Sequence, residues 1–210
     1  MSETRRTEAF SDGVLAIAIT LLVLDLRVPV RDALEGSLAD ALGHEWPTYA
    51  AYVTSFLVIG IIWVNHHAVF ELLGAIDRVA LFLNLLLLMT VAAIPFATSL
   101  FAEYLTAGGA AARTAALVYS GLFLVMSLAF GVLYGYAGYH PALLAPGVDP
   151  VAVRASIFWF SGVGLALYSL TMVIAVFSAP ATLVAHLVIA LYYCFRQTRT
   201  QKRPQASAAS

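Results

Sequence analysis

Two carboxylates in this sequence lie inside a stretch that is otherwise apolar. Asp12 and Asp25 fall near opposite ends of residues 10–26, and no other acidic or basic residue lies within a long apolar run. A carboxylate in such a place can cap a helix N-terminus, pair with a cation, or take part in proton transfer. For Asp12, a helix cap and a buried anchor paired with a cation are both open.

A second group of reactive side chains, Asn65, His66 and His67, follows another apolar run. Histidine is a common general acid or base near neutral pH, so these histidines and Asp12 can be combined in an acid–base mechanism. They can equally mark the membrane surface. Neighbouring histidines on a helix point about 100° apart, unlike an i, i+4 zinc-binding pair, so no structural metal site is predicted.

Six apolar runs must position these side chains. The chain has 210 residues, 61% apolar and 11% charged, whereas soluble domains carry about 25% charged residues. An ordinary soluble globule is therefore excluded. The runs do not alternate as barrel strands do, and they suit helices that cross a bilayer. They comprise residues 10–26, 46–64, 79–102, 114–136, 156–177 and 180–195. The sequence predicts an all-α membrane protein with six transmembrane helices.

Local signals refine this architecture. Pro95 predicts a kink in the third run, and Ser178 followed by Pro180 predicts a capped, tight hairpin between the last two runs. Residues 32–35 have helix-forming character within the longest outer loop. We expect a transmembrane domain over residues 1–195, followed by a basic, disordered tail over residues 196–210.

The basic residues predict the orientation of the chain. An even number of spans puts both termini on one side, and of the 11 lysines and arginines only Arg27, Arg31 and Arg113 fall on the other side. This asymmetry predicts a multi-pass protein of the cell membrane with both termini in the cytoplasm. It also places one polar group at the cytoplasmic surface, where it would hold the first span against the second and third. The group comprises Arg6, Ser11, Asp12, Asn65, His66, His67 and Arg78.

Other polar residues within the runs are expected to serve packing. Asn84 and His186 are predicted to donate hydrogen bonds between helices, although either can also belong to a proton path. On the first run, Ile17, Leu21 and Leu24 follow i, i+4, i+7 spacing, with Thr20 beside them. Spacing alone favours a surface that faces lipid or another helix over a pore wall.

Several functional classes are disfavoured. The net charge of −1 supplies no basic face, so nucleic acid is not an expected partner. The lone Cys194 excludes an intrachain disulfide. Phosphate-binding and hydrolase motifs are absent, and no cofactor is expected. Residues 132–136 are the nearest approach to the TVGYG filter of potassium channels and do not match it. No internal repeat is found, so a symmetric pore would need several chains.

The segment Arg6-Thr7-Glu8-Ala9-Phe10-Ser11-Asp12 matches an RxxxFSD signature. In this it resembles the lysosomal potassium-channel family called transmembrane protein 175. Residues 13–24, residues 63–67 and the six-span layout are also similar to that family. The resemblance implies a homotetramer in which the first helix of each chain lines a central pore.

The resemblance also implies roles for single residues. Ile17 would form a narrow hydrophobic constriction, Leu21 and Leu24 would continue the pore wall, and Thr20 would add a polar layer. Residues Arg6, Phe10, Ser11 and Asp12 would belong to the scaffold rather than bind ions. For Asp25, we expect either attraction of cations to the outer mouth or a cap or salt bridge with Arg27 or Arg31.

The leading hypothesis is a passive, potassium-preferring cation channel with a hydrophobic gate, and not an enzyme. Its expected partners are transient potassium ions, membrane lipid and further copies of the chain. Two alternatives remain: a membrane-embedded enzyme that uses Asp12, His66 and His67, and a proton-coupled transporter.

Overall fold

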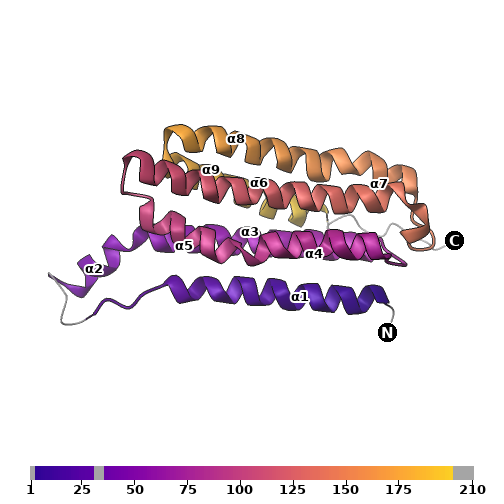
Figure 1. Cartoon of the computed structure of the whole chain (residues 1–210), viewed down its shortest axis with the longest axis horizontal. Coiled ribbons are helices and arrows are strands. Elements are labelled where there is room, and N and C mark those ends of the chain that lie inside the picture. Colours follow the sequence, from indigo (N-terminus) through magenta and orange to yellow (C-terminus); the bar gives the residue numbers. More distant parts are fainter. Residues whose placement is uncertain (1–2, 31–35, 201–210) are drawn as a thin grey trace.

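The computed structural model describes residues 3–30 and 36–200, and the side chains of all of these except residues 160 and 196–200. The described residues form an all-helical bundle (Figure 1). Its α-helices are α1 (Glu3–Leu21), α2 (Leu38–His44), α3 (Trp46–Glu71), α4 (Arg78–Ala92), α5 (Ile94–Tyr104), α6 (Gly109–Tyr139), α7 (Pro150–Ile157), α8 (Val163–Phe177) and α9 (Ala179–Thr200). Short 3₁₀ turns follow α1 at Leu22–Asp25 and α6 at Pro141–Leu143.

Four helical segments of the described chain are long and apolar enough to cross a membrane. They are Glu3–Asp25, Trp46–Glu71, Arg78–Tyr104 and Gly109–Tyr139. The apolar parts of the last two helices, Val163–Phe177 and Ala179–Phe195, are shorter. The all-helical membrane fold is thus confirmed, and the crossing of the bilayer by six helices stays a prediction.

The helix break at Pro95 and the helix cap at Ser178 lie where the sequence predicts them. The third run divides into α4 and α5 at Ala93, with Pro95 in the first turn of α5, because proline cannot continue the hydrogen bonds of the preceding helix. At the start of α9, the Ser178 hydroxyl accepts a hydrogen bond from the backbone N–H of Ala181 at 3.3 Å, as expected of a cap. The helix continues to Thr200, so residues 196–200 are helical and not disordered as predicted. The rest of the predicted tail, 201–210, lies outside the described residues.

The fifth run contains a helical irregularity that the sequence did not indicate. Between α7 and α8, residues Phe158–Gly162 form a π-helical turn, in which hydrogen bonds reach back five residues. In the loop between the first two predicted runs, residues 32–35 lie outside the described part of the chain. The helix found there is α2, which the reciprocal hydrogen bonds of Ser37 and Asp40 cap.

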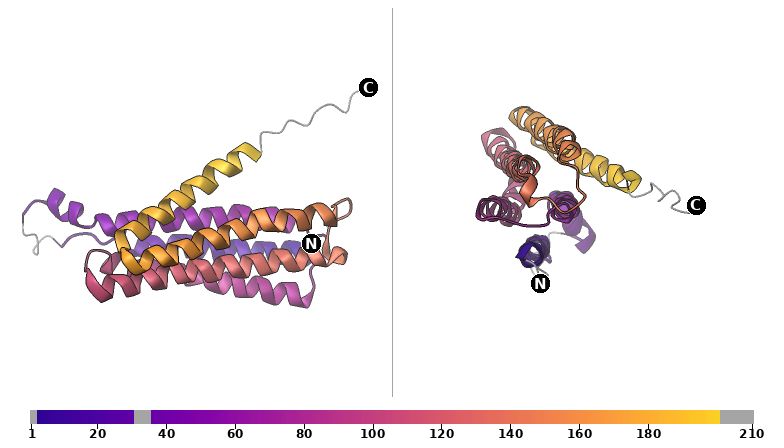
Figure 2. Two further views of the ribbon diagram at one scale, coloured as in Figure 1. Left: turned by 90° about the horizontal axis from the view of Figure 1, so that it is seen from above. Right: turned by 90° about the vertical axis from the view of Figure 1, so that its right-hand side faces the viewer.

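Helix α6 packs against α4, α5 and α8. Its Tyr119 and Phe123 are fully buried, and the Tyr119 hydroxyl is hydrogen-bonded to Ser55 of α3 at 2.8 Å. By contrast, α1 lies at one edge of the bundle, against α3 and α4, and α9 leaves the bundle at an angle (Figure 2). One long face of α1 is therefore left without a partner from the described chain.

The connections at the end of the bundle where α1 begins are tied together. The backbone N–H of Gly74 donates to the carbonyl of Leu143, and that of Ala145 to the carbonyl of Leu72, both at 2.9 Å. A Cβ atom on Gly74 would lie 3.0 Å from Ala145 Cα, so any other residue here would force the neighbouring backbone to shift by a few tenths of an ångström. Asp77 adds a further tie, because it caps α4 through the N–H of Ala80 and accepts the hydroxyl of Tyr136 at 2.7 Å.

The hydrogen bonds that the Asp77 carboxylate accepts make the free energy of unfolding depend on pH in the acidic range. The Ala80 N–H, and then the Tyr136 hydroxyl, hold the pKa of the Asp77 carboxyl below its ordinary value. Since this pKa is lowered on folding, the stabilisation is complete above the ordinary carboxyl pKa and is lost as pH falls through the lowered one. We expect the Asp77→Asn variant to unfold at a lower temperature than the parent chain at about pH 7, and the difference to shrink towards about pH 3.

Thermal unfolding in detergent micelles across this pH range measures the difference. The exposed Glu103 provides a matched control, and Glu103→Gln should show a much smaller pH-dependent change. A gap between Asp77→Asn and the parent chain that is constant over the whole range would contradict the prediction.

Candidate functional site

The two faces of α1 differ in exposure. Ser11, Leu15, Ala18 and Leu22 are buried against the rest of the bundle, as the spacing of one helix face requires. The opposite side, here called the outward face of α1, consists of Ile17 and Leu21 and, in the 3₁₀ turn that follows, Leu24, which are 60%, 42% and 73% exposed. The stripe predicted from the sequence therefore does not pack within its own chain. It is left to face lipid or another copy.

A buried polar network fastens the inner face of α1. The amide of Asn84 in α4 donates to Ser11 Oγ at 2.9 Å, and Nε2–H of His66 in α3 donates to Asn84 Oδ1, also at 2.9 Å. Ser11 in turn donates to the carbonyl of Thr7 at 2.9 Å. Ser11, Asn84 and His66 are each at most 1% exposed. One amide thus joins three helices, and the prediction that Asn84 bonds between helices is confirmed.

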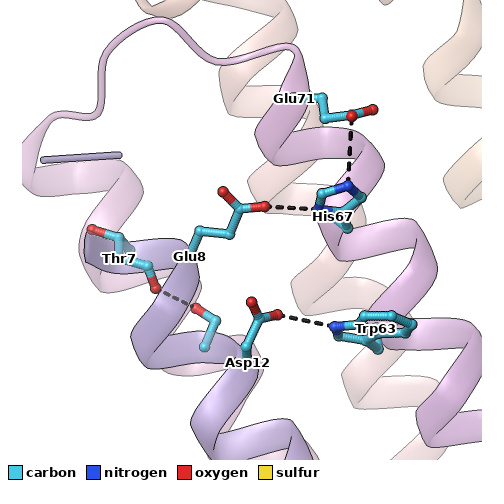
Figure 3. Close-up of polar contacts among 7 residues, drawn as sticks. Thr7, Glu8, Asp12, Trp63, His67 and Glu71 are labelled. Carbon is cyan, nitrogen blue, oxygen red and sulfur yellow. Dashed lines mark hydrogen bonds and ion pairs between the residues drawn. The ribbon is translucent and has the colours of Figure 1, made fainter. Parts of the chain in front are cut away.

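A second set of polar contacts forms a ladder along the seam between α1 and α3 (Figure 3). The indole N–H of Trp63 donates to Asp12 Oδ1 at 3.0 Å, and one turn further along, His67 Nδ1 donates to Glu8 Oε1 at 2.8 Å. His67 Nε2 lies 3.5 Å from Glu71 Oε1. Both rungs arise because residues four apart on each of two antiparallel helices share a face.

The structure resolves the two interpretations of Asp12. Asp12 lies in the third turn of α1, which begins at Glu3, so it does not cap the helix. It is partly buried and paired, but the partner is the neutral indole of Trp63 rather than a cation. A charge-assisted bond to an indole satisfies the carboxylate without adding a second charge to the membrane segment.

Only some residues of the predicted polar group lie together in the structure. Ser11, Asp12, His66 and His67 do hold α1 against α3 and α4. Asn65 lines a small cavity of about 50 Å³ with residues of α6 and α8, and Arg6 lines a groove with Arg78 instead of contacting Asp12. Sequence reasoning missed Glu8 and Glu71 as partners of His67, although the i, i+4 spacing of His67 and Glu71 was a usable signal.

The residues of the enzyme alternative do not form a common site. His66 is bonded to Asn84 and His67 to Glu8, while Asp12 is bonded to Trp63. In the described part of the chain, no group of three or more His, Cys, Asp and Glu residues could hold a metal ion. His186 is fully buried, and its Nδ1 is bonded to the carbonyl of Thr182 in its own helix, so the predicted bond between helices is not formed by that atom.

Thr20 lies in the last turn of α1, and Asp25 ends the 3₁₀ turn that follows it. Asp25 is partly buried and lines a small cavity of about 70 Å³ together with Arg27, Glu45 and Glu103. Among the described side chains, no ion pair joins Asp25 to Arg27; Arg31 lies outside the described residues. The exposed Thr20 hydroxyl donates to the carbonyls of Ala16 and Ile17, both at 2.9 Å, and its oxygen lone pairs stay available.

These features define a polytopic helical membrane protein with one apolar helix face held outward. A family model described as "Endosomal/lysosomal potassium channel TMEM175" matches residues 6–95. A potassium channel of Streptomyces collinus is 51% identical over 207 residues, covering 99% of each chain. The crystal structure of a lysosomal potassium-selective channel TMEM175 homologue from Chamaesiphon minutus matches with a TM-score of 0.81 and 38% identity, over 93% of this chain and 98% of that one.

The chain therefore belongs to the TMEM175 family, whose members are ion channels rather than enzymes. The human endosomal/lysosomal proton channel TMEM175 is 42% identical over 108 residues, which are 47% of this chain and 21% of the human protein. This shorter match and that of the family model each cover about half of the chain or less.

The buried network predicts that Asn84 is the most sensitive polar residue of the α1 seam. The Asn84→Leu substitution leaves His66 Nε2–H without its acceptor in a dry site, which costs about 1–3 kcal/mol. We expect a clear fall in the thermal unfolding temperature in detergent. Trp63→Phe, which removes one bond at a partly exposed rung, should cost less. An Asn84→Leu protein as stable as the parent chain would contradict the assignment.

Proposed function

We propose that four copies of this chain form a passive, potassium-preferring cation channel in the cell membrane, with six transmembrane helices in each copy. The observation that carries the proposal is the outward face of α1. A chain of this family holds an apolar helix face away from its own bundle, and a ring of four such faces would enclose a pore. The names of the relatives from Streptomyces collinus and Chamaesiphon minutus describe potassium channels, which agrees with this function.

The proposed pore works by a hydrophobic constriction. In it, the Ile17 side chains form the narrowest ring, and Leu21 and Leu24 extend the wall outward. An apolar ring excludes water when it is narrow, so an ion must shed part of its hydration shell to cross. Potassium holds its water less tightly than sodium, and this difference favours potassium.

Thr20 and Asp25 complete the proposed path. With its proton donated to the helix backbone, the Thr20 oxygen would present lone pairs to a partly dehydrated cation one turn from Ile17. The carboxylate of Asp25 would raise the local cation concentration at the outer mouth. Both termini would lie in the cytoplasm, as the distribution of arginines and lysines favours.

The Ile17→Asn substitution tests the constriction. A polar amide ring would hold water and reduce the dehydration barrier, so we expect the ratio of potassium to sodium permeability to fall several-fold. Bilayer recordings of the reconstituted protein measure this ratio. Val125→Asn serves as the control, because Val125 is 50% exposed but belongs to α6. An unchanged ratio, or an equal change in the control, would remove Ile17 from the filter.

Mass and flux measurements test the assembly and the mode of transport. In mild detergent, native mass spectrometry should give a mass of four chains, and liposomes containing only this protein should release potassium down its gradient. A monomer would leave the outward face of α1 to lipid. Potassium movement that requires a proton gradient would favour the transporter, and absence of flux would count against both transport functions.

A further inference from the structure

A groove between α1 and α4 lies beside the polar network and is not part of the proposed pore wall. It has a volume of about 510 Å³. Its charged lining residues are Glu3 and Arg6 from α1 and Arg78 from α4. Its apolar lining residues are Phe10, Leu81, Phe82 and Leu85, and the buried Asn84 also contributes to the lining.

The two arginines give the groove a net positive charge. Both are exposed, and among the described side chains no ion pair joins either of them to a carboxylate. Asp77, the acidic neighbour of Arg78, is already bonded to the Ala80 N–H and the Tyr136 hydroxyl. Two guanidinium groups that lie on one groove suit a phosphate, since each can donate two parallel hydrogen bonds to its oxygens.

The apolar wall continues from the arginines along α4 towards the middle of the bundle. The Arg78 guanidinium carbon lies 5.8 Å from the centre of the Phe82 ring, one helical turn further on. Phe82 and Leu85 are 58% and 46% exposed, and Phe10 faces the same groove from α1. A charged mouth above an exposed apolar wall matches a molecule with an anionic head and a hydrocarbon chain.

We propose that this groove binds an anionic phospholipid, with its phosphate between Arg6 and Arg78 and an acyl chain along Phe10, Phe82 and Leu85. Basic pockets between transmembrane helices are known to hold such headgroups. A free phosphate ion would use the arginines but not the exposed apolar wall. Because Asn84 lines the groove and also bonds to Ser11, the bound lipid touches the network that fastens α1.

Thermal unfolding in detergent with added lipid tests the site. Phosphatidylglycerol at about ten times its Kd should raise the unfolding temperature of the parent protein by roughly 3 °C. Phosphatidylcholine and inorganic phosphate should give much smaller shifts. In the double variant Arg6→Gln/Arg78→Gln the shift should be lost, whereas Arg5→Gln, which removes an exposed arginine outside the groove lining, should keep it. Equal shifts with both lipids, or equal losses in both variants, would overturn the proposal.

Photolabelling of the unsubstituted protein provides a second measurement. A photoactivatable phosphatidylglycerol with its reactive group in the acyl chain should label the parent protein within residues 81–85, as mapped by mass spectrometry. Labelling confined to other helices would overturn the proposal. The Phe82→Cys variant, made in a Cys194→Ala background, tests whether the groove is instead an interface between copies. Efficient cross-linking between chains at this cysteine, together with no lipid labelling, would also overturn the proposal. None of these readouts depends on ion flux.

Discussion

The attachment of α1 through one face only is the constraint on which the rest of the structure depends. In lipid, apolar contacts alone give little preference for one helix neighbour over another, so packing and hydrogen bonds between helices must fix the position of α1. The bonds among Ser11, Asn84 and His66 do this inside the bundle, and the two rungs at Glu8 and Asp12 do it along the seam. Together these bonds hold one face of α1 against the bundle and leave the opposite face exposed.

Much of the architecture could be predicted from the sequence because lipid imposes a simple rule on composition. The scarcity of charge within the apolar runs located the helices, and Pro95 and Ser178 marked the break between α4 and α5 and the hairpin before α9. The stripe through Ile17 was visible as spacing, but its exposure was not. Exposure depends on which neighbours surround α1, and spacing within one helix carries no information about them.

Residue pairing across helices was the hardest feature to predict. Asp12 offered two local explanations, and its partner Trp63 lies 51 residues away. Asn84 was one of several polar residues in long apolar runs until its position between Ser11 and His66 was known. Arg6 was grouped with Asp12 because the predicted topology places both at the same membrane surface, yet Arg6 lies on the groove with Arg78. At about 100° per residue, positions close in sequence often face different neighbours.

The π-helical turn between α7 and α8 changes how this chain aligns with others. A π turn takes one more residue than an α-helix to cover a similar rise, and it rotates everything beyond it about the helix axis. In a homologue with a regular α-helix here, a chain that is one residue shorter would keep the helix faces of Val153 and Tyr168 in the same relative orientation. Within residues 158–162, a single-residue gap between relatives would therefore preserve the packing on both sides, whereas a gapless alignment would pair residues that face different directions.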